Sequence, residues 1–136
     1  MTQLAFAAFS AVGQMAAGAA QRRGYEQQAE QAELRGRSEA IAYKQQGADA
    51  LRNLNETLAA IISRAGSGGV DPTSGSAATM QMYAMSEGAR EKNISQDNQV
   101  LALGQASMQA GEYRSAGKAA QLSSFVSAAG TLGQGA

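Results

Sequence analysis

Cysteine, histidine and tryptophan are absent from the 136 residues, and Pro72 is the only proline. Without cysteine the chain can form no disulfide, and without cysteine and histidine together it lacks the ligands of ordinary zinc sites. The absence of histidine also removes the general base on which most hydrolases depend. We therefore expect no catalytic residues, no metal site, no cofactor and no small-molecule substrate, and we expect that the chain is not an enzyme.

Net charge is absent as well, because 11 basic residues balance 11 acidic ones and the longest basic run is Arg22-Arg23. Binding to nucleic-acid phosphates needs clustered positive charge, so sequence-specific nucleic-acid binding is not expected. Glu26, Glu30 and Glu33 share one helix face and could in principle act as an acid/base set. Beside the two arginines, a solvated or interface face is the favoured interpretation.

Large apolar residues are scarce: leucine, isoleucine, valine and phenylalanine together make up 20 of the 136 residues. The abundant apolar residue is alanine, which is the best helix former but buries only one methyl group, worth roughly 0.8 kcal/mol per carbon. A single chain of this kind has a thin core. We therefore expect its helices to be ordered mainly by neighbouring chains in a homo-oligomeric assembly.

The pattern along the chain predicts an all-α protein, a long helical hairpin that is elongated and ordered in an oligomeric assembly. The segment 21–64 lacks proline and is rich in alanine, glutamine, glutamate and arginine, and its 44 residues would reach roughly 66 Å as a helix. Two helices joined by one loop favour an antiparallel hairpin. The predicted segments are a weakly apolar helical segment (1–20), a long amphipathic helix (21–64), a hinge loop (65–76), a second helix (77–118) and a small-residue tail, marginally helical with a frayed end (119–136).

Large apolar residues at helical spacing predict the stripe through which the helices pack. In the predicted helix 21–64 these residues are spaced so that they lie on one face, and in the predicted helix 77–118 they are spaced seven residues apart. A thinner stripe of Leu34, Ile41 and Ala48 also follows seven-residue steps. The predicted packing stripe is Leu51, Leu54, Leu58, Ile61, Ile62, Ile94, Leu101 and Met108.

Glycine, serine and the lone proline cluster between the two helices and predict a hinge. Asp-Pro is a turn signal, and a serine that follows it, Ser74 or Ser76, can cap the next helix. The predicted hinge residues are Gly66, Gly69, Val70, Asp71, Pro72, Ser74, Gly75 and Ser76.

The N-terminal segment is uncharged from Thr2 to Ala20 and is followed at once by Arg22-Arg23. Its length is near the roughly 20 residues that span a bilayer, but polar residues interrupt it. Three interpretations stay open: a helix packed against other subunits, conditional membrane insertion, and a cleaved signal peptide. The residues that would form this packing or membrane segment are Leu4, Phe6, Phe9, Val12, Gly13, Met15 and Ala17.

The loop region contains Arg64-Ala65-Gly66, Gly69-Val70-Asp71 and Ser74-Gly75-Ser76, and Glu87-Gly88 follows in the second predicted helix. Together with the small-residue ends and the two polar helices, these segments carry a resemblance to the internal virion proteins of short-tailed bacteriophages, also called core or ejection proteins. The resemblance covers most of the chain. It implies a location inside the virion near the portal or tail, with core, portal or tail proteins as partners. It also implies that the chain leaves the capsid with the DNA, contacts the host membrane and helps to form a conduit across the host envelope.

Two alternatives remain for the function. One is a permanent structural protein of the tail or portal that stays with the particle. The other is a bacterial secreted helical translocator or pore-former outside any virus.

Overall fold

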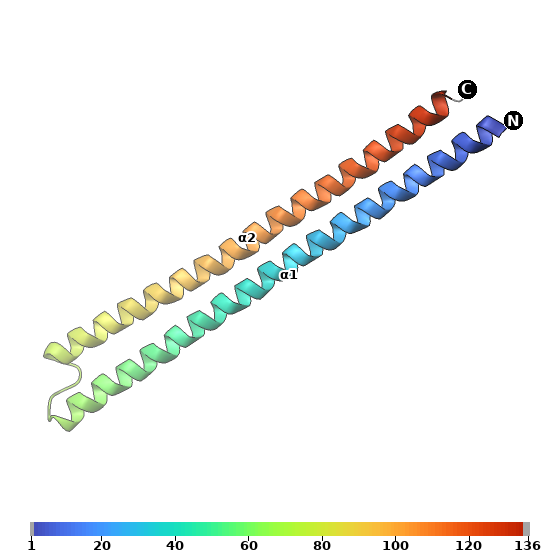
Figure 1. Cartoon of the computed structure of the whole chain (residues 1–136). Coiled ribbons are helices and arrows are strands. Elements are labelled where there is room, and N and C mark those ends of the chain that lie inside the picture. The colour runs from blue at the N-terminus through green and yellow to red at the C-terminus, as the bar shows by residue number, and fades with distance from the viewer. Residues whose placement is uncertain (1, 135–136) are drawn as a thin grey trace. The chain divides into compact units, whose positions relative to one another are not determined.

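The chain folds into two α-helices that pack as a hairpin, α1 (Thr2–Ser67) and α2 (Gly75–Gln134) (Figure 1). The computed structural model describes residues 2–134, including the side chains of Ala5 and of residues 8–133. No strand occurs in this described part. The predicted all-α class and the helical hairpin are therefore confirmed.

Both helices are longer than the sequence pattern predicted. The N-terminal segment 1–20 is not separate, because α1 runs without interruption from Thr2 to Ser67. The segment 119–136, expected to be a marginal helix with a frayed end, is helical to Gln134, and residues 135–136 lie outside the described residues. Each glycine in a helix costs roughly 1 kcal/mol relative to alanine, but in these segments Ala11, Gly18 and Ala128 are buried against the other helix. Packing therefore extends the helices beyond what local propensity indicates.

A Schellman motif ends α1. The Val70 N–H donates to the Ala65 carbonyl oxygen at 3.0 Å, and the Gly69 N–H donates to the Gly66 carbonyl oxygen at 3.3 Å. Gly69 has a φ of 71°, a left-handed conformation that glycine adopts without strain. The hinge is accordingly shorter than predicted, because Gly66 belongs to α1.

The loop then makes a turn over Asp71-Pro72. The Ser74 N–H donates to the Asp71 carbonyl oxygen at 3.2 Å, and proline suits the second position of such a turn. The Ser74 hydroxyl also donates to this oxygen, and Ser74 directly precedes the first residue of α2. α2 begins at Gly75, which has a φ of 61°. Gly75 and Ser76 therefore lie in α2, and residues 68–74 form the loop.

Two compact units divide the hairpin: the first comprises Met1–Gly36 with Gly104–Ala136, and the second comprises Arg37–Leu103. In each unit, α1 and α2 meet along a line of buried residues that we call the seam. The large side chains expected in a core are missing from it, because every buried apolar residue in the described part is alanine. The predicted thin core is therefore confirmed for the described residues.

In the first unit, small residues form the seam on both helices. Ala29, Ala110 and Ala128 are completely buried. On α2, Ala110 and Gly117 are followed by the half-buried Ser124 and Thr131 at steps of seven residues. Small side chains allow two helix backbones to approach closely, which is why this series faces the partner helix. The buried residues of this unit are Ala11, Gly18, Ala29, Ala32, Gly36, Ala106, Ala110, Gly117 and Ala128.

In the second unit, three larger residues join the seam. Leu54, Leu58 and Ile61 are half-buried, and an added Cβ on Gly88 would lie 2.6 Å from a methyl carbon of Leu54. The buried Ser95 donates its hydroxyl to the Tyr43 carbonyl oxygen across the seam. The buried residues of this unit are Gly47, Ala77, Gly88, Ser95 and Ala102.

The remaining members of the predicted packing stripe do not contribute to this seam. Their exposed fractions range from 38% for Leu51 to 70% for Met108. The thinner stripe is exposed as well. Large and small residues both recur at seven-residue spacing. The small residues face the other helix because they allow the two backbones to approach more closely. The stripe residues that lie outside the seam are Leu51, Ile62, Ile94, Leu101 and Met108, together with Leu34, Ile41 and Ala48 of the thinner stripe.

Candidate assembly surface

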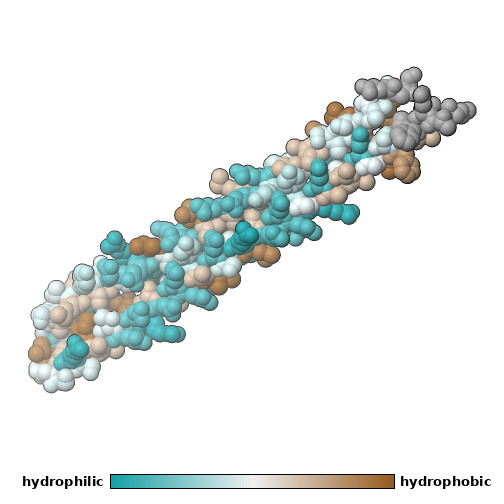
Figure 2. Space-filling model, viewed as in Figure 1, coloured by the Kyte–Doolittle hydropathy of each residue, from teal (hydrophilic) through white to brown (hydrophobic). Residues whose placement is uncertain are grey.

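The exposed surface carries the large apolar side chains that the seam lacks. Figure 2 shows brown, apolar residues interspersed with teal, polar ones on the visible face. Phe9 is 85% exposed, Met82 and Tyr83 are each 72% exposed, and Val126 is 67% exposed. Single exposed apolar residues are ordinary, but their number here contrasts with a seam of alanine and glycine. The arrangement is that of a chain whose larger hydrophobic groups remain available to other molecules.

In the first unit several of these residues lie in the uncharged ends of the two helices. Phe9 and Val12 come from α1, and Leu122, Phe125 and Val126 come from α2, each more than half exposed. An exposed apolar group without neighbouring charge loses little polar hydration when another surface covers it. This part of the surface is therefore well suited to association.

Several residues of the predicted N-terminal segment are exposed and do not pack closely against α2. Met15 is 38% exposed, and Ala17 is exposed. A Cβ added to Gly13 would meet nothing within 4 Å, so Gly13 and Ala17 are not the small residues at which α1 comes close to α2. Gly18 makes that approach instead, because it faces α2. The side chains of Leu4 and Phe6 lie outside the described residues.

Neither helix, over the residues described, combines the length and apolarity needed to cross a membrane.

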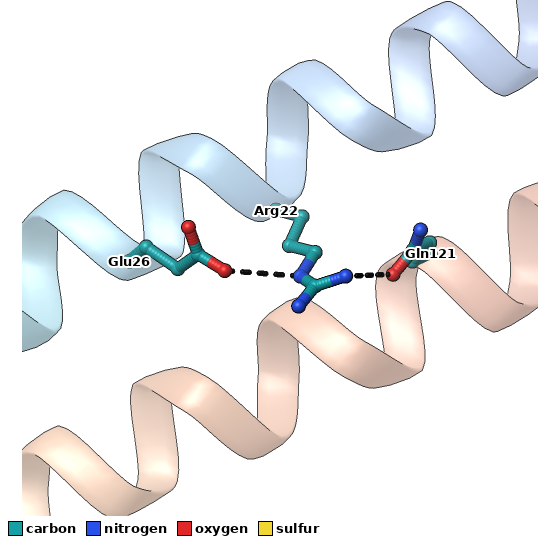
Figure 3. A network of polar contacts seen from close by, with 3 residues as sticks. All are labelled: Arg22, Glu26 and Gln121. Atoms are coloured by element: carbon teal, nitrogen blue, oxygen red, sulfur yellow. Dashed lines mark hydrogen bonds and ion pairs between the residues drawn. The ribbon is translucent and has the colours of Figure 1, made fainter.

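A polar network bridges the helices in the first unit (Figure 3). The Arg22 guanidinium contacts the Glu26 carboxylate at 3.0 Å and donates to the Gln121 side-chain oxygen at 2.7 Å. Lys118 and Arg114 line the same open groove of about 270 Å³. Its charges are mixed and largely balanced, which favours a role in joining the helices over binding a charged ligand.

Glu33, the third carboxylate of the glutamate face for which a solvated or interface role was favoured, also bridges the helices. Its carboxylate accepts a hydrogen bond from the Arg114 guanidinium at 2.7 Å, and the two side chains are 33% and 52% exposed. Since Glu26 and Glu33 each contact an arginine, the interpretation as structural bridges is favoured over acid/base chemistry. Sequence reasoning missed both cross-helix partners, because they are 99 and 81 residues distant along the chain.

Replacing Glu33 with glutamine is expected to lower the free energy of unfolding by about 0.2–1 kcal/mol, because partly exposed ion pairs contribute little. The loss should shrink as salt is added, since salt screens the pair. Chemical denaturation at low and high salt measures both effects. Glu30→Gln is the matched control, because Glu30 forms no ion pair in the described part of the chain. Equal losses for both variants would contradict the prediction.

The loop contains one carboxyl group with a perturbed pKa. The Thr73 hydroxyl donates to Asp71 Oδ1 at 2.6 Å and the Thr73 N–H donates to the same atom at 2.9 Å. These bonds stabilise the carboxylate and lower the pKa of Asp71, the hydroxyl contributing most. The loop therefore gains stability above the ordinary pKa of aspartate, and loses it as the pH falls through the lowered value.

Thr73→Val is expected to raise the pKa of Asp71 toward its ordinary value, because the larger of the two stabilising bonds is removed. Titration of the carboxyl carbon by nuclear magnetic resonance measures the change. Thr79→Val serves as a control, since the Thr79 hydroxyl donates to the Gly75 carbonyl oxygen and does not contact Asp71. An unchanged pKa in Thr73→Val would contradict the assignment.

An apolar groove of about 430 Å³ lies near the loop in the second unit. Thr57 and Ile61 of α1 line it together with Met80, Tyr83 and Ala84 of α2. The groove is a hydrophobic surface feature that adjoins the exposed methionines.

No group of three or more acidic, histidine or cysteine residues that could hold a metal ion occurs in the described part of the chain.

Comparisons with known proteins add no relative: no family model, no curated protein and no solved structure matches this chain.

Proposed function

We propose that this chain is a structural subunit that assembles with other protein chains. The observation that carries the proposal is the inverted distribution of apolar residues. Alanine and glycine hold α1 against α2, whereas phenylalanine, valine, leucine and methionine side chains are exposed. Exposed apolar groups are stabilised when another protein surface covers them, at about 25 cal/mol per Å².

More narrowly, we propose an internal virion protein of a short-tailed bacteriophage that leaves the capsid with the DNA and helps to form a conduit across the host envelope. The resemblance of the loop region supports this proposal. A seam of small residues supports it too, because a hairpin that buries little surface unfolds at low cost. Low unfolding cost suits a protein that passes through a narrow tail.

Quantitative mass spectrometry of purified particles, before and after triggered DNA release, tests the narrower proposal. The copy number of this chain is measured against that of the capsid protein. Presence in full particles and loss from emptied ones is the expected result. Retention after release would overturn ejection and identify a permanent tail or portal component. Absence from both would overturn the virion role and favour the secreted translocator.

A further inference from the structure

A second series of apolar residues follows α2 at steps of seven residues and does not take part in the seam. Ile94, Leu101 and Met108 are 50%, 58% and 70% exposed. Side chains seven residues apart in a helix recur after two turns and share a face, which is the pattern of a helix that packs against a partner helix. Met80 and Leu122 lie fourteen residues beyond Ile94 and Met108, with Glu87 and Ser115 at the intervening positions, and they are 61% and 69% exposed.

Glu87 on this face has Ser115 as its counterpart, and the oppositely charged Arg90 and Glu112 are arranged symmetrically about Leu101. Arg90 and Glu112 lie eleven residues before and after it, which places each within about 20° of Leu101 around the helix axis. Neither forms an ion pair in the described part of the chain. Asp97 and Gln105 lie four residues before and after Leu101, on the flanks of the same face.

We propose that this face of α2 binds the same face of a second copy of the chain, antiparallel, with Leu101 on the two-fold axis. Such an interface must be complementary to itself. In this register every apolar residue faces an apolar one, Arg90 faces Glu112, and the Gln105 amide faces the Asp97 carboxylate. The opposed pairs are Leu101 with Leu101, Ile94 with Met108, Asp97 with Gln105, Arg90 with Glu112, Tyr83 with Ala119 and Met80 with Leu122.

The charges select the antiparallel arrangement over the parallel one. With two copies parallel and in register, Arg90 would face Arg90, Asp97 would face Asp97 and Glu112 would face Glu112. Like charges opposed at a helix interface are destabilising, whereas opposite charges fix orientation and register. The inference rests on the proposed function as an assembling subunit and names the partner and the face.

Sedimentation equilibrium of the purified full-length chain tests the face. Leu101→Asp is expected to raise the dissociation constant of the dimer about a hundredfold, because it removes two buried leucines and opposes two carboxylates. Val100→Asp is the matched control: Val100 is the neighbouring residue and is 72% exposed, but it points about 100° away around the helix. Equal weakening by both variants, or a wild-type chain that stays monomeric, would overturn the proposal.

Single charge reversals test the pairing of Arg90 with Glu112. Arg90→Glu and Glu112→Arg are each expected to weaken the dimer about tenfold, because each opposes two like charges. The double variant restores opposite charges in both pairs and should recover most of the affinity. A double variant weaker than either single variant would contradict this register.

Disulfide trapping reports the orientation, since the native chain contains no cysteine. Leu101→Cys is expected to link to itself, and a mixture of Ile94→Cys with Met108→Cys should give the mixed disulfide. Ile94→Cys alone should not link, because two such residues are roughly 21 Å apart in the antiparallel register and disulfides need Cα atoms within about 7 Å. Efficient self-linking of Ile94→Cys would show a parallel pair and overturn the proposal. These solution results are independent of whether particles lose the chain, so the dimer and the virion role can fail separately.

Discussion

Gly18→Leu is expected to lower the free energy of unfolding by about 3 kcal/mol, whereas Gly24→Leu on the same helix should raise it by about 0.8 kcal/mol. An added Cβ at Gly18 would lie 1.9 Å from the Ser124 hydroxyl oxygen and 2.6 Å from the Ser124 Cβ. The hydroxyl can rotate away, but the Cβ is attached to the backbone of α2 and cannot. The helices must therefore separate, and the neighbouring alanine contacts are lost with them.

A Cβ added at Gly24 would meet nothing within 4 Å. Leucine there replaces a poor helix former with a good one and leaves the seam intact. Urea denaturation of dilute samples, followed by circular dichroism, measures both variants under conditions that limit self-association. Opposite signs are the diagnostic result. Destabilisation of similar size at both positions would mean that α2 does not approach Gly18 as closely as the structure shows.

Replacing four exposed apolar residues of the first unit with glutamine is expected to abolish assembly beyond the dimer while sparing the hairpin. The variant combines Phe9→Gln, Val12→Gln, Phe125→Gln and Val126→Gln, at side chains that are 85%, 66%, 59% and 67% exposed. Exposed substitutions typically change stability by no more than about 0.5 kcal/mol each, and glutamine is a good helix former. The hydrophobic surface available to partners is nevertheless removed.

Sedimentation velocity over a concentration series measures the assembly, and thermal denaturation of dilute samples measures the hairpin. The matched control places glutamine at Ala16, Ala19, Ala20 and Ala129, which are exposed residues of the same segments. The control adds the same polar groups but removes no large apolar side chain. If the hairpin of the first variant lost several kcal/mol, these side chains would be part of its core and the assembly surface would be wrongly placed. If both variants assembled beyond the dimer equally well, this further association would use another surface.

The cross-helix contacts follow one register in both units. Four glycines of the seam contact a side chain of the other helix at a position whose number, added to that of the glycine, gives 142. This places the centre of the pairing at Asp71, within the loop. The glycine contacts are Gly18 with Ser124, Gly117 with Tyr25, Gly47 with Ser95 and Gly88 with Leu54.

The sequence by itself determined the helices, the position of the loop and the thin core. Alanine-rich segments without proline indicate helices, the cluster around Asp71-Pro72 indicates the turn, and twenty large apolar residues are too few for a conventional core. These properties depend on local propensity and composition, so they can be predicted without knowing which residues meet. The small residues at steps of seven, such as Gly88, Ser95 and Ala102, were a signal that could have been used.

Only the tertiary structure decided which of two stripes faces the partner helix. On α2, the series Ile94, Leu101 and Met108 has the same seven-residue spacing as Gly88, Ser95 and Ala102, so periodicity cannot distinguish them. The choice depends on how near the two backbones come, and glycine, serine and alanine permit the nearer approach. The loop then sets the register that brings Arg22 to Gln121 and Glu33 to Arg114. Such pairs arise from the distance between two helices, which no local pattern contains.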